Sequence, residues 1–211
     1  MHMKMKLVVL GVVLGLFAFA PVASAAPFGA AYNGGVFTLD LVSHNVANTQ
    51  FTVVYTADLT NFTGDNGNQD WIYGVGFMPT PSNISGFSGS SGYGWFFRAD
   101  ELSANGCGNG NDSFACASTW NGTAFQPLAR STVGGPGLGP VYTWTFVLDY
   151  SSAVNDFTLE GVSIKAAFSS NNTGSAQAGL MSLTTTQIPE PVSLLILGTG
   201  LLGAGLLRRR R

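Results

Sequence analysis

The sequence predicts an all-β domain, an antiparallel β-sandwich, between two apolar terminal segments. Three observations support this prediction. Residues 26–187 are rich in Gly, Ser, Asn and Thr, yet they carry many aromatic side chains. Their apolar residues recur with a period of two, as in strands, and polar stretches with glycine separate the runs. Seven or eight such strands in about 160 residues suit two stacked sheets, and jelly-roll and immunoglobulin-like strand orders both remain open.

The clearest predicted strands have an apolar side chain at every second position. Residues 37–41, 51–59 and 142–150 follow this pattern, and the positions between are Thr or Asp except for Val54 and Val147. One face of each strand should therefore meet a core and the other face water. Residues 93–98 and 179–184 are two further predicted strands, and no segment of the middle has the pattern of an amphipathic helix.

Two other runs predict local features. In residues 71–77, the side chains of Trp71, Tyr73, Val75 and Phe77 should share one face, opposite Gly74 and Gly76. Glycines on a strand face leave room for another group to approach closely. Between residues 157 and 168 the apolar alternation changes parity at Glu160-Gly161, which predicts a β-bulge there. The predicted loops are the polar stretches 60–70, 79–92, 105–122 and 131–140.

Cys107 and Cys116 are the only cysteines, and both lie in one predicted loop. In an exported protein, two cysteines at this spacing favour a local disulfide that closes a ring of ten residues. A zinc site would need more ligands than the chain offers. His44 is the only histidine outside the first 25 residues.

The charge distribution argues against nucleic-acid binding. Between residues 27 and 187 there are ten acidic side chains and only three basic ones: Arg98, Arg130 and Lys165. Binding phosphates requires clustered Lys and Arg, which this part of the sequence lacks.

The middle of the sequence also offers few side chains that could catalyse a reaction, which predicts that the protein is not an enzyme. His44 follows a strand and reads as a loop residue rather than a member of a catalytic triad. Asp100 and Glu101 could suggest a glycosidase dyad, but adjacent strand residues point to opposite faces and would not flank one bond. No cofactor is predicted. Asp65 and Asp70 could form a weak Ca²⁺ site, but this segment departs from the EF-hand pattern at its third and twelfth positions, and a solvated turn is the default interpretation.

The N-terminus has the three parts of a secretory signal peptide, residues 1–25. Lys4 and Lys6 precede an uncharged apolar run from Leu7 to Ala20. Ala23-Ser24-Ala25 then supplies the small residues that signal peptidase requires. Cleavage is expected after Ala25, or after Ala26; a retained membrane anchor is the alternative.

The C-terminus, residues 188–211, combines a proline-rich motif, an apolar segment and a basic cluster. Pro189-Glu190-Pro191 precedes 16 uncharged residues, Val192 to Leu207, and then the four arginines Arg208, Arg209, Arg210 and Arg211. As a helix the apolar segment would measure about 24 Å, short for a hydrocarbon core of about 30 Å but able to span one with bilayer thinning or snorkelling arginines. The arginines should remain cytoplasmic, which places residues 26–187 outside the inner membrane.

This order of features closely resembles the PEP-CTERM sorting signal of Gram-negative bacteria. The resemblance covers the tail alone, through Pro189, Glu190, Pro191 and the arginine cluster, and implies nothing about the middle domain. It implies recognition by an exosortase, a membrane-embedded cysteine protease or transpeptidase. It further implies an inner-membrane-anchored precursor that is processed and passed to the cell surface or the extracellular matrix. Without such an enzyme the tail would be a simple membrane anchor.

Two functions are therefore expected for the exported domain. The first is a non-enzymatic surface or matrix protein, for instance in biofilm and in contact with exopolysaccharide. The alternative is a carbohydrate-binding module, since the flat rings of Trp71, Trp95 and Trp120 lie near predicted loops and could stack on sugars. Tryptophans of this kind are more often core residues.

Overall fold

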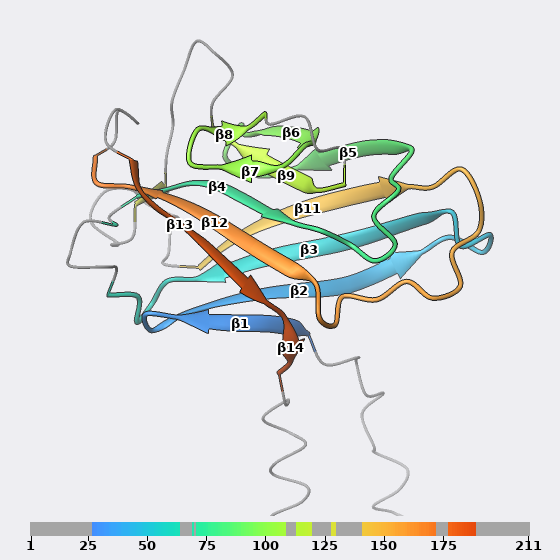
Figure 1. Ribbon diagram of the computed structural model, residues 1–211, viewed down its shortest axis with the longest axis horizontal. Helices are drawn as coiled ribbons and strands as arrows, with labels where there is room; N and C mark the ends of the chain where they lie inside the picture. Colours follow the sequence, from blue (N-terminus) through green and yellow to red (C-terminus); the bar gives the residue numbers. More distant parts are fainter. Residues whose placement is uncertain are drawn as a thin grey trace, which may run out of the picture.

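Two antiparallel sheets face each other in the structure, a computed structural model that describes residues 27–63, 69, 71–108, 113–119, 128–129, 141–171 and 177–188 (Figure 1). The first sheet has the strand order β14-β1-β2-β3-β11-β5. The second has the order β13-β12-β4-β9-β6, with β10 also pairing with β4. The predicted all-β class is confirmed, and no helix occurs among the described residues.

The strands have the following bounds. The first sheet contains β1 (Phe28–Tyr32), β2 (Gly35–His44), β3 (Gln50–Asp58), β5 (Gly86–Ser90), β11 (Val141–Asp149) and β14 (Thr186–Gln187). The second contains β4 (Trp71–Phe77), β6 (Phe96–Ala99), β9 (Ala115–Ser118), β10 (Leu128–Ala129), β12 (Ser163–Ser169) and β13 (Gln177–Thr184). A separate hairpin pairs β7 (Leu102–Ser103) with β8 (Gly106–Cys107).

The alternating runs form the middle of the first sheet, as predicted. Across β2, β3 and β11, Leu39 pairs with Tyr55 and Tyr55 with Trp144, and all three side chains are fully buried. Their neighbours along the strands, four threonines with Asp40 and Val54, point to the opposite face and are more exposed. The predicted strand 179–184 is confirmed by β13, whereas β6 begins three residues later than the predicted start at residue 93.

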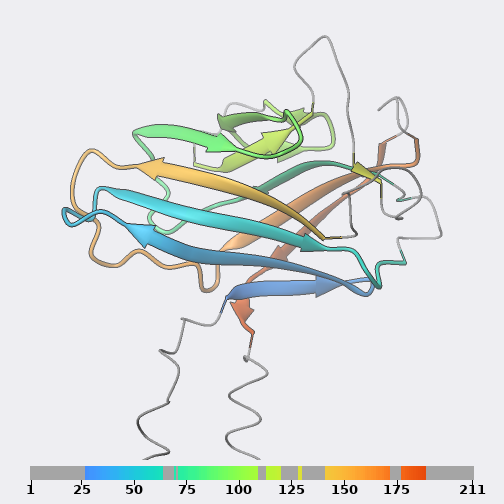
Figure 2. The ribbon, with the colours of Figure 1, turned by 180° about the vertical axis from the view of Figure 1, so that it is seen from behind.

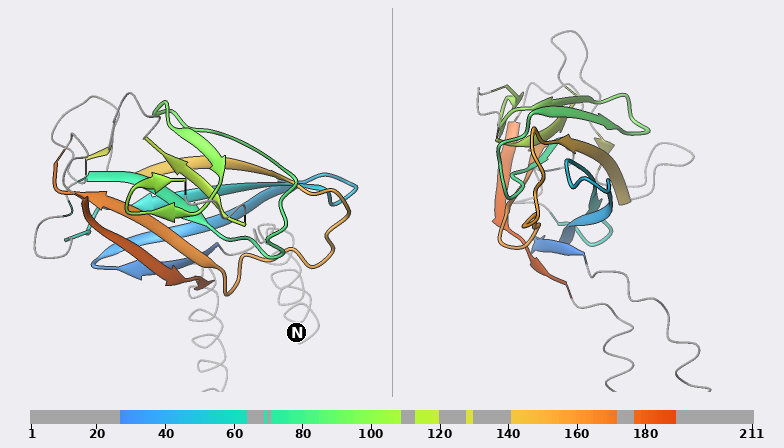
Figure 3. Two further views of the ribbon diagram at one scale, coloured as in Figure 1. Left: turned by 45° about the horizontal axis from the view of Figure 1, so that its top comes forward. Right: turned by 90° about the vertical axis from the view of Figure 1, so that its right-hand side faces the viewer.

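Aromatic side chains fill the space between the two layers, which Figure 3 shows edge-on. The rings of Phe77 and Phe146, from opposite sheets, meet edge to face with 5.2 Å between centroids. Trp144 lies 4.9 Å from Trp95 and 5.6 Å from Tyr55. The Tyr55 hydroxyl donates a 3.0 Å hydrogen bond to the carbonyl oxygen of Lys165 in β12, which joins the sheets through the core.

β4 departs from simple alternation. The register with β12 shifts so that Phe168 pairs with Ile72 and Ala167 with Gly74, which leaves Tyr73 as an extra residue. The prediction that Trp71, Tyr73, Val75 and Phe77 share one face is therefore wrong. Ile72, Val75 and Phe77 belong to the core between the sheets, whereas Tyr73 lies on the outer face with the glycines. Its hydroxyl donates to the carbonyl oxygen of Ala104 at 2.5 Å. The alternation could not reveal this bulge, because aromatic residues stand on both sides of it.

The predicted bulge at Glu160-Gly161 is wrong, since these residues form a turn and β12 begins at Ser163. Gly161 has a φ of 70°, the left-handed region that a glycine enters without steric cost. Before the turn, Thr158 makes only an isolated bridge with Thr80. The parity change thus marks two separate segments joined by a tight corner.

Three strands, β5, β8 and β9, occur within predicted loops because most of their residues are small. In β9 every side chain is buried, Ala115 and Ala117 toward the core and Cys116 toward the outer hairpin. A strand covered on both faces by close neighbours has room only for such residues. In β5, a Cβ added to Gly89 would lie 2.1 Å from the Phe97 ring, so the glycine admits that ring.

Buried tyrosines predict a loss of stability at alkaline pH. Burial raises the pKa of Tyr73 to about 12 and the pKa of Tyr55 well above its usual value, so both stay protonated in the folded state after the unfolded chain has ionised near pH 10. The unfolding temperature should therefore be flat from about pH 7 to 9 and fall above about pH 10. Circular dichroism melts across this range measure it. Tyr73→Phe should make the fall shallower; a flat profile up to about pH 12 would contradict the assignment.

Candidate functional site

The described chain begins and ends on one edge of the first sheet. β14 pairs with β1 through Gln187 opposite Phe28 and Thr186 opposite Gly29. One residue further, the amide of Ile188 donates to the carbonyl oxygen of Pro27 at 3.0 Å. Figure 2, seen from behind, shows the two strands side by side below β2. The segments that leave the domain toward the predicted signal peptide and the predicted sorting tail therefore start next to each other.

Ile188 packs over a position that has no side chain. A Cβ built on Gly29 would lie 2.8 Å from Ile188 Cδ1 and 2.4 Å from the carbonyl oxygen of Phe37. Only glycine leaves this space free, so the absence of a side chain at residue 29 lets the last described residue lie against β1. Ile188 is consequently half-buried, whereas Thr186 and Gln187 are exposed.

Thr185 fixes the point where the chain crosses from the second sheet to the first. It is 1% exposed, and its hydroxyl donates to the carbonyl oxygen of Leu159 at 2.5 Å. That hydroxyl also accepts from the amide of Val162 at 3.1 Å, and the Thr185 amide donates to the Val162 carbonyl oxygen at 2.9 Å. The amide of Gly161 donates to the Thr185 carbonyl oxygen at 3.0 Å. All of the polar groups of Thr185 are thus satisfied by one turn.

All of the predicted processing residues lie outside the described part of the chain. These are Ala23, Ala25 and Ala26, the Pro189-Glu190-Pro191 motif, and Arg208, Arg209, Arg210 and Arg211. The sequence nevertheless fixes how many residues lie between the domain and the apolar segment. Three residues separate Ile188 from Val192, where the apolar segment begins. Even fully extended, three residues span at most about 10 Å.

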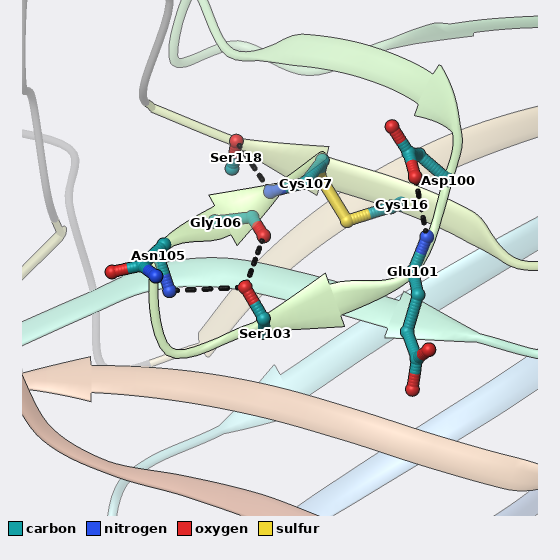
Figure 4. Close-up of a disulfide and its surroundings, with 8 residues drawn as sticks. All are labelled: Asp100, Glu101, Ser103, Asn105, Gly106, Cys107, Cys116 and Ser118. Carbon is teal, nitrogen blue, oxygen red and sulfur yellow. Dashed lines mark hydrogen bonds between the residues drawn. A yellow bond between two sulfur atoms is a disulfide. The ribbon is translucent and has the colours of Figure 1, made fainter. Parts of the chain in front are cut away.

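The predicted disulfide is present and attaches the β7–β8 hairpin to the outer face of the second sheet. Cys107 of β8 is bonded to Cys116 of β9 with a Cα–Cα distance of 5.9 Å (Figure 4). The β7–β8 hairpin carries Leu102, which is fully buried and lies over the two glycines of β4. A Cβ on Gly74 would come within 2.6 Å of Leu102 Cδ1. The close approach predicted at these glycines is confirmed, and the approaching group is the chain's own hairpin.

Glu101, one of the two carboxylates considered for catalysis, is engaged in an ion pair. Lys165 Nζ lies 2.5 Å from Glu101 Oε1 and 4.5 Å from the centre of the Phe114 ring. The lysine side chain is 10% exposed and the glutamate 33%. Figure 4 shows the side chains of Asp100 and Glu101 extending in opposite directions. Sequence reasoning missed this pair, although a lysine inside an apolar strand is a signal that an acid lies nearby.

The other candidate residues are placed as follows. Trp95 is 6% exposed and packs on Trp144, so its ring belongs to the core. Trp71 is half-buried at the start of β4, and Trp120 lies outside the described residues. The exposed His44 stacks on Phe51 and its Nδ1 lies 3.2 Å from the Asn45 carbonyl oxygen. Asp65 and Asp70 also lie outside the described residues. Among those described, no three His, Cys, Asp or Glu side chains gather as metal ligands would.

Comparison with known proteins identifies one feature. Residues 187–211 match the family model of the PEP-CTERM protein-sorting motif. No curated protein matches the chain. Within the described part of the chain, no helix is both long and apolar enough to cross a membrane. The matched span begins at Gln187, so the motif and the folded sheet overlap at the end of β14.

Proposed function

We propose that this chain, whose PEP-CTERM motif implies an exported protein sorted by an exosortase, is the precursor of a non-enzymatic surface or matrix protein. The single observation that carries the proposal is the match at residues 187–211. Before processing, Val192 to Leu207 anchor the precursor in the inner membrane of a Gram-negative cell, and the terminal arginines keep their cytoplasmic position. The β-sandwich then lies on the outer side.

Cleavage near Pro189-Glu190-Pro191 would separate the domain from this anchor. Proline has no amide donor and restricts the residue before it, so the two prolines disfavour a regular helix at this point. Extended segments are the form in which many proteins take up peptides, because their backbone groups remain available for pairing. The motif thus presents Glu190 to an enzyme in a segment that is poorly suited to join the membrane helix.

The released domain would act through its surface rather than by catalysis. Two observations on the described residues support this part of the proposal: Glu101 is paired with Lys165, and His44 stacks on Phe51 with its Nδ1 at the carbonyl oxygen of Asn45. The carbohydrate-binding alternative loses support, because the buried ring of Trp95 has no free face to offer a sugar. We propose the extracellular matrix, including its exopolysaccharide, as the surroundings of the mature protein.

Peptide mapping of the C-terminus tests the proposal. Extracellular protein should lack Val192 to Arg211, whereas protein from a strain without exosortase should retain them and remain with the membrane fraction. Recovery of the Leu206-Leu207-Arg208 end on mature surface protein would overturn the processing step. The N-terminus, read in the same digest, should begin at Ala26 or Pro27.

A further inference from the structure

The segment next to the motif is held by the domain itself. Thr186 lies just outside the span matched by the sorting motif, and Ile188 lies inside it, yet both belong to the edge of the first sheet. The hold consists of backbone pairing with β1 and the packing of Ile188 over Gly29. It is a short contact, since β14 has only two residues and both of their side chains are exposed.

Thr185 divides this end of the chain into a fixed part and a part that can separate. It makes five hydrogen bonds to the turn at residues 159–162, and Thr185, Leu159 and Val162 are all buried. The three residues after it are joined to β1 alone among the described strands. Loss of that pairing would therefore leave the rest of the domain, up to Thr185, in place.

Separation would change how far the motif can reach. With β14 paired, three residues join the sheet to the apolar segment, a span of at most about 10 Å. With β14 separated, the free chain runs from Thr186 to Pro191, and six residues reach at most about 20 Å. While paired, one side of the backbone at Thr186 and Ile188 is also occupied by β1. An enzyme that takes its substrate as an extended strand must displace that partner.

We propose that β14 is a releasable strand that controls exosortase access, so that the motif is processed only from the state in which β14 has left β1. The inference rests on the proposed function and deepens it by assigning a role to residues upstream of the Pro-Glu-Pro motif. The backbone amides of Thr186 and Ile188, rather than the Thr186 side chain, hold the strand in this scheme. The fraction of precursor with β14 separated sets the effective concentration of substrate, and weaker pairing raises the processing rate.

Thr186→Pro is the variant that separates the strand while leaving the matched motif unchanged. The Ile188 amide bonds to Pro27, and antiparallel ladders alternate, so the pair Gly29–Thr186 is the next hydrogen-bonded one. Proline at residue 186 removes that donor. In a pulse-chase experiment, conversion of precursor to mature protein should accelerate about two- to tenfold, the effect of one backbone hydrogen bond on a two-state equilibrium.

Thr186→Ala is the matched control, because the side chain is exposed and the amide is kept; its conversion rate should equal that of the wild type. The purified soluble domain carrying Thr186→Pro should melt close to the wild-type temperature, because the remainder of both sheets is untouched. Conversion of a folded Thr186→Pro precursor at or below the wild-type rate would overturn the inference.

A cross-link provides the opposite change. Phe28 and Gln187 form the non-hydrogen-bonded pair, in which Cα atoms lie about 4.5 Å apart, within the range that a disulfide bridges. Oxidised Phe28→Cys/Gln187→Cys precursor should accumulate unprocessed, and mild reduction should restore conversion to the rate of the Gln187→Cys single variant. Processing of the cross-linked form at the wild-type rate would contradict the role of β14.

The two proposals fail in different ways. Alanine replacement of Pro189-Glu190-Pro191 tests processing itself, and normal conversion of that variant would reject the proposed function. If that variant is blocked while Thr186→Pro behaves as the wild type, processing stands and only the role of β14 is rejected.

Discussion

Replacing Pro189-Glu190-Pro191 with three alanines is expected to leave nearly all of the protein as full-length, membrane-bound precursor. Each Pro→Ala change inside a helix removes an unfavourable contribution of about 3 kcal/mol and restores an amide donor. The apolar helix that is expected from Val192 can then extend toward the domain, and the extended segment that an enzyme would bind is lost. The result would be a membrane protein with the same domain and no route to release.

Immunoblots of membrane and extracellular fractions measure this outcome directly. A suitable control carries alanines at the exposed loop residues Ser151 and Ser152, which should be exported and processed as in the wild type. Mature extracellular protein from the triple-alanine precursor, at wild-type levels, would show that the Pro-Glu-Pro motif is not required.

The second large effect concerns stability. Removing the disulfide with Cys107→Ala/Cys116→Ala should lower the free energy of unfolding by about 2–3 kcal/mol, the loop-closure contribution of a ring of this size. For a domain of this length the unfolding temperature should drop by about 5–10 °C. The loss should be concentrated in the β7–β8 hairpin, because Leu102 covers the β4 glycines only while this hairpin stays in place.

Thermal melts and hydrogen exchange at residues 102–107 test this prediction together. Wild-type domain reduced before melting is the matched control and should reproduce the shift of the double variant. When exported protein is alkylated without prior reduction, its intact mass should show no added alkyl group, because both cysteines are held in the disulfide. Equal melting temperatures for oxidised and cysteine-free domain would show that packing alone, with the Lys165–Glu101 pair, holds the hairpin.

The strands that could be predicted from the sequence are those with one covered and one exposed face. In β2, β3 and β11 a buried aromatic or aliphatic residue recurs at every second position, mostly with Thr or Asp between, and this pattern alone indicates a sheet with a single core. The pattern fails where both faces are covered: β9 consists of Ala115, Cys116, Ala117 and Ser118, which look like loop residues until the hairpin is seen above them. The disulfide was predictable because it needs only spacing and compartment.

The pairing of β1 with β14 was beyond sequence reasoning for a different reason. Neither strand has a clear alternation of apolar and polar residues, and the two strands lie at opposite ends of the domain sequence. The sorting motif could be recognised from its residues because it is local, but its attachment to the sheet depends on Gly29 and on the turn that holds Thr185. The residues that carry the signal and those that place it are thus far apart in the chain.

The pairing of Pro27 with Ile188 also places the two chain ends of the domain next to each other. Adjacent antiparallel strands bring such ends within about 5 Å, the gap that a short turn bridges. The chain could accordingly be joined there and opened elsewhere, for instance at Val46, which is fully exposed at the tip of the β2–β3 connection. The same proximity lets the whole domain be grafted into a surface loop of another protein, entering and leaving through two neighbouring backbone positions without stretching its host.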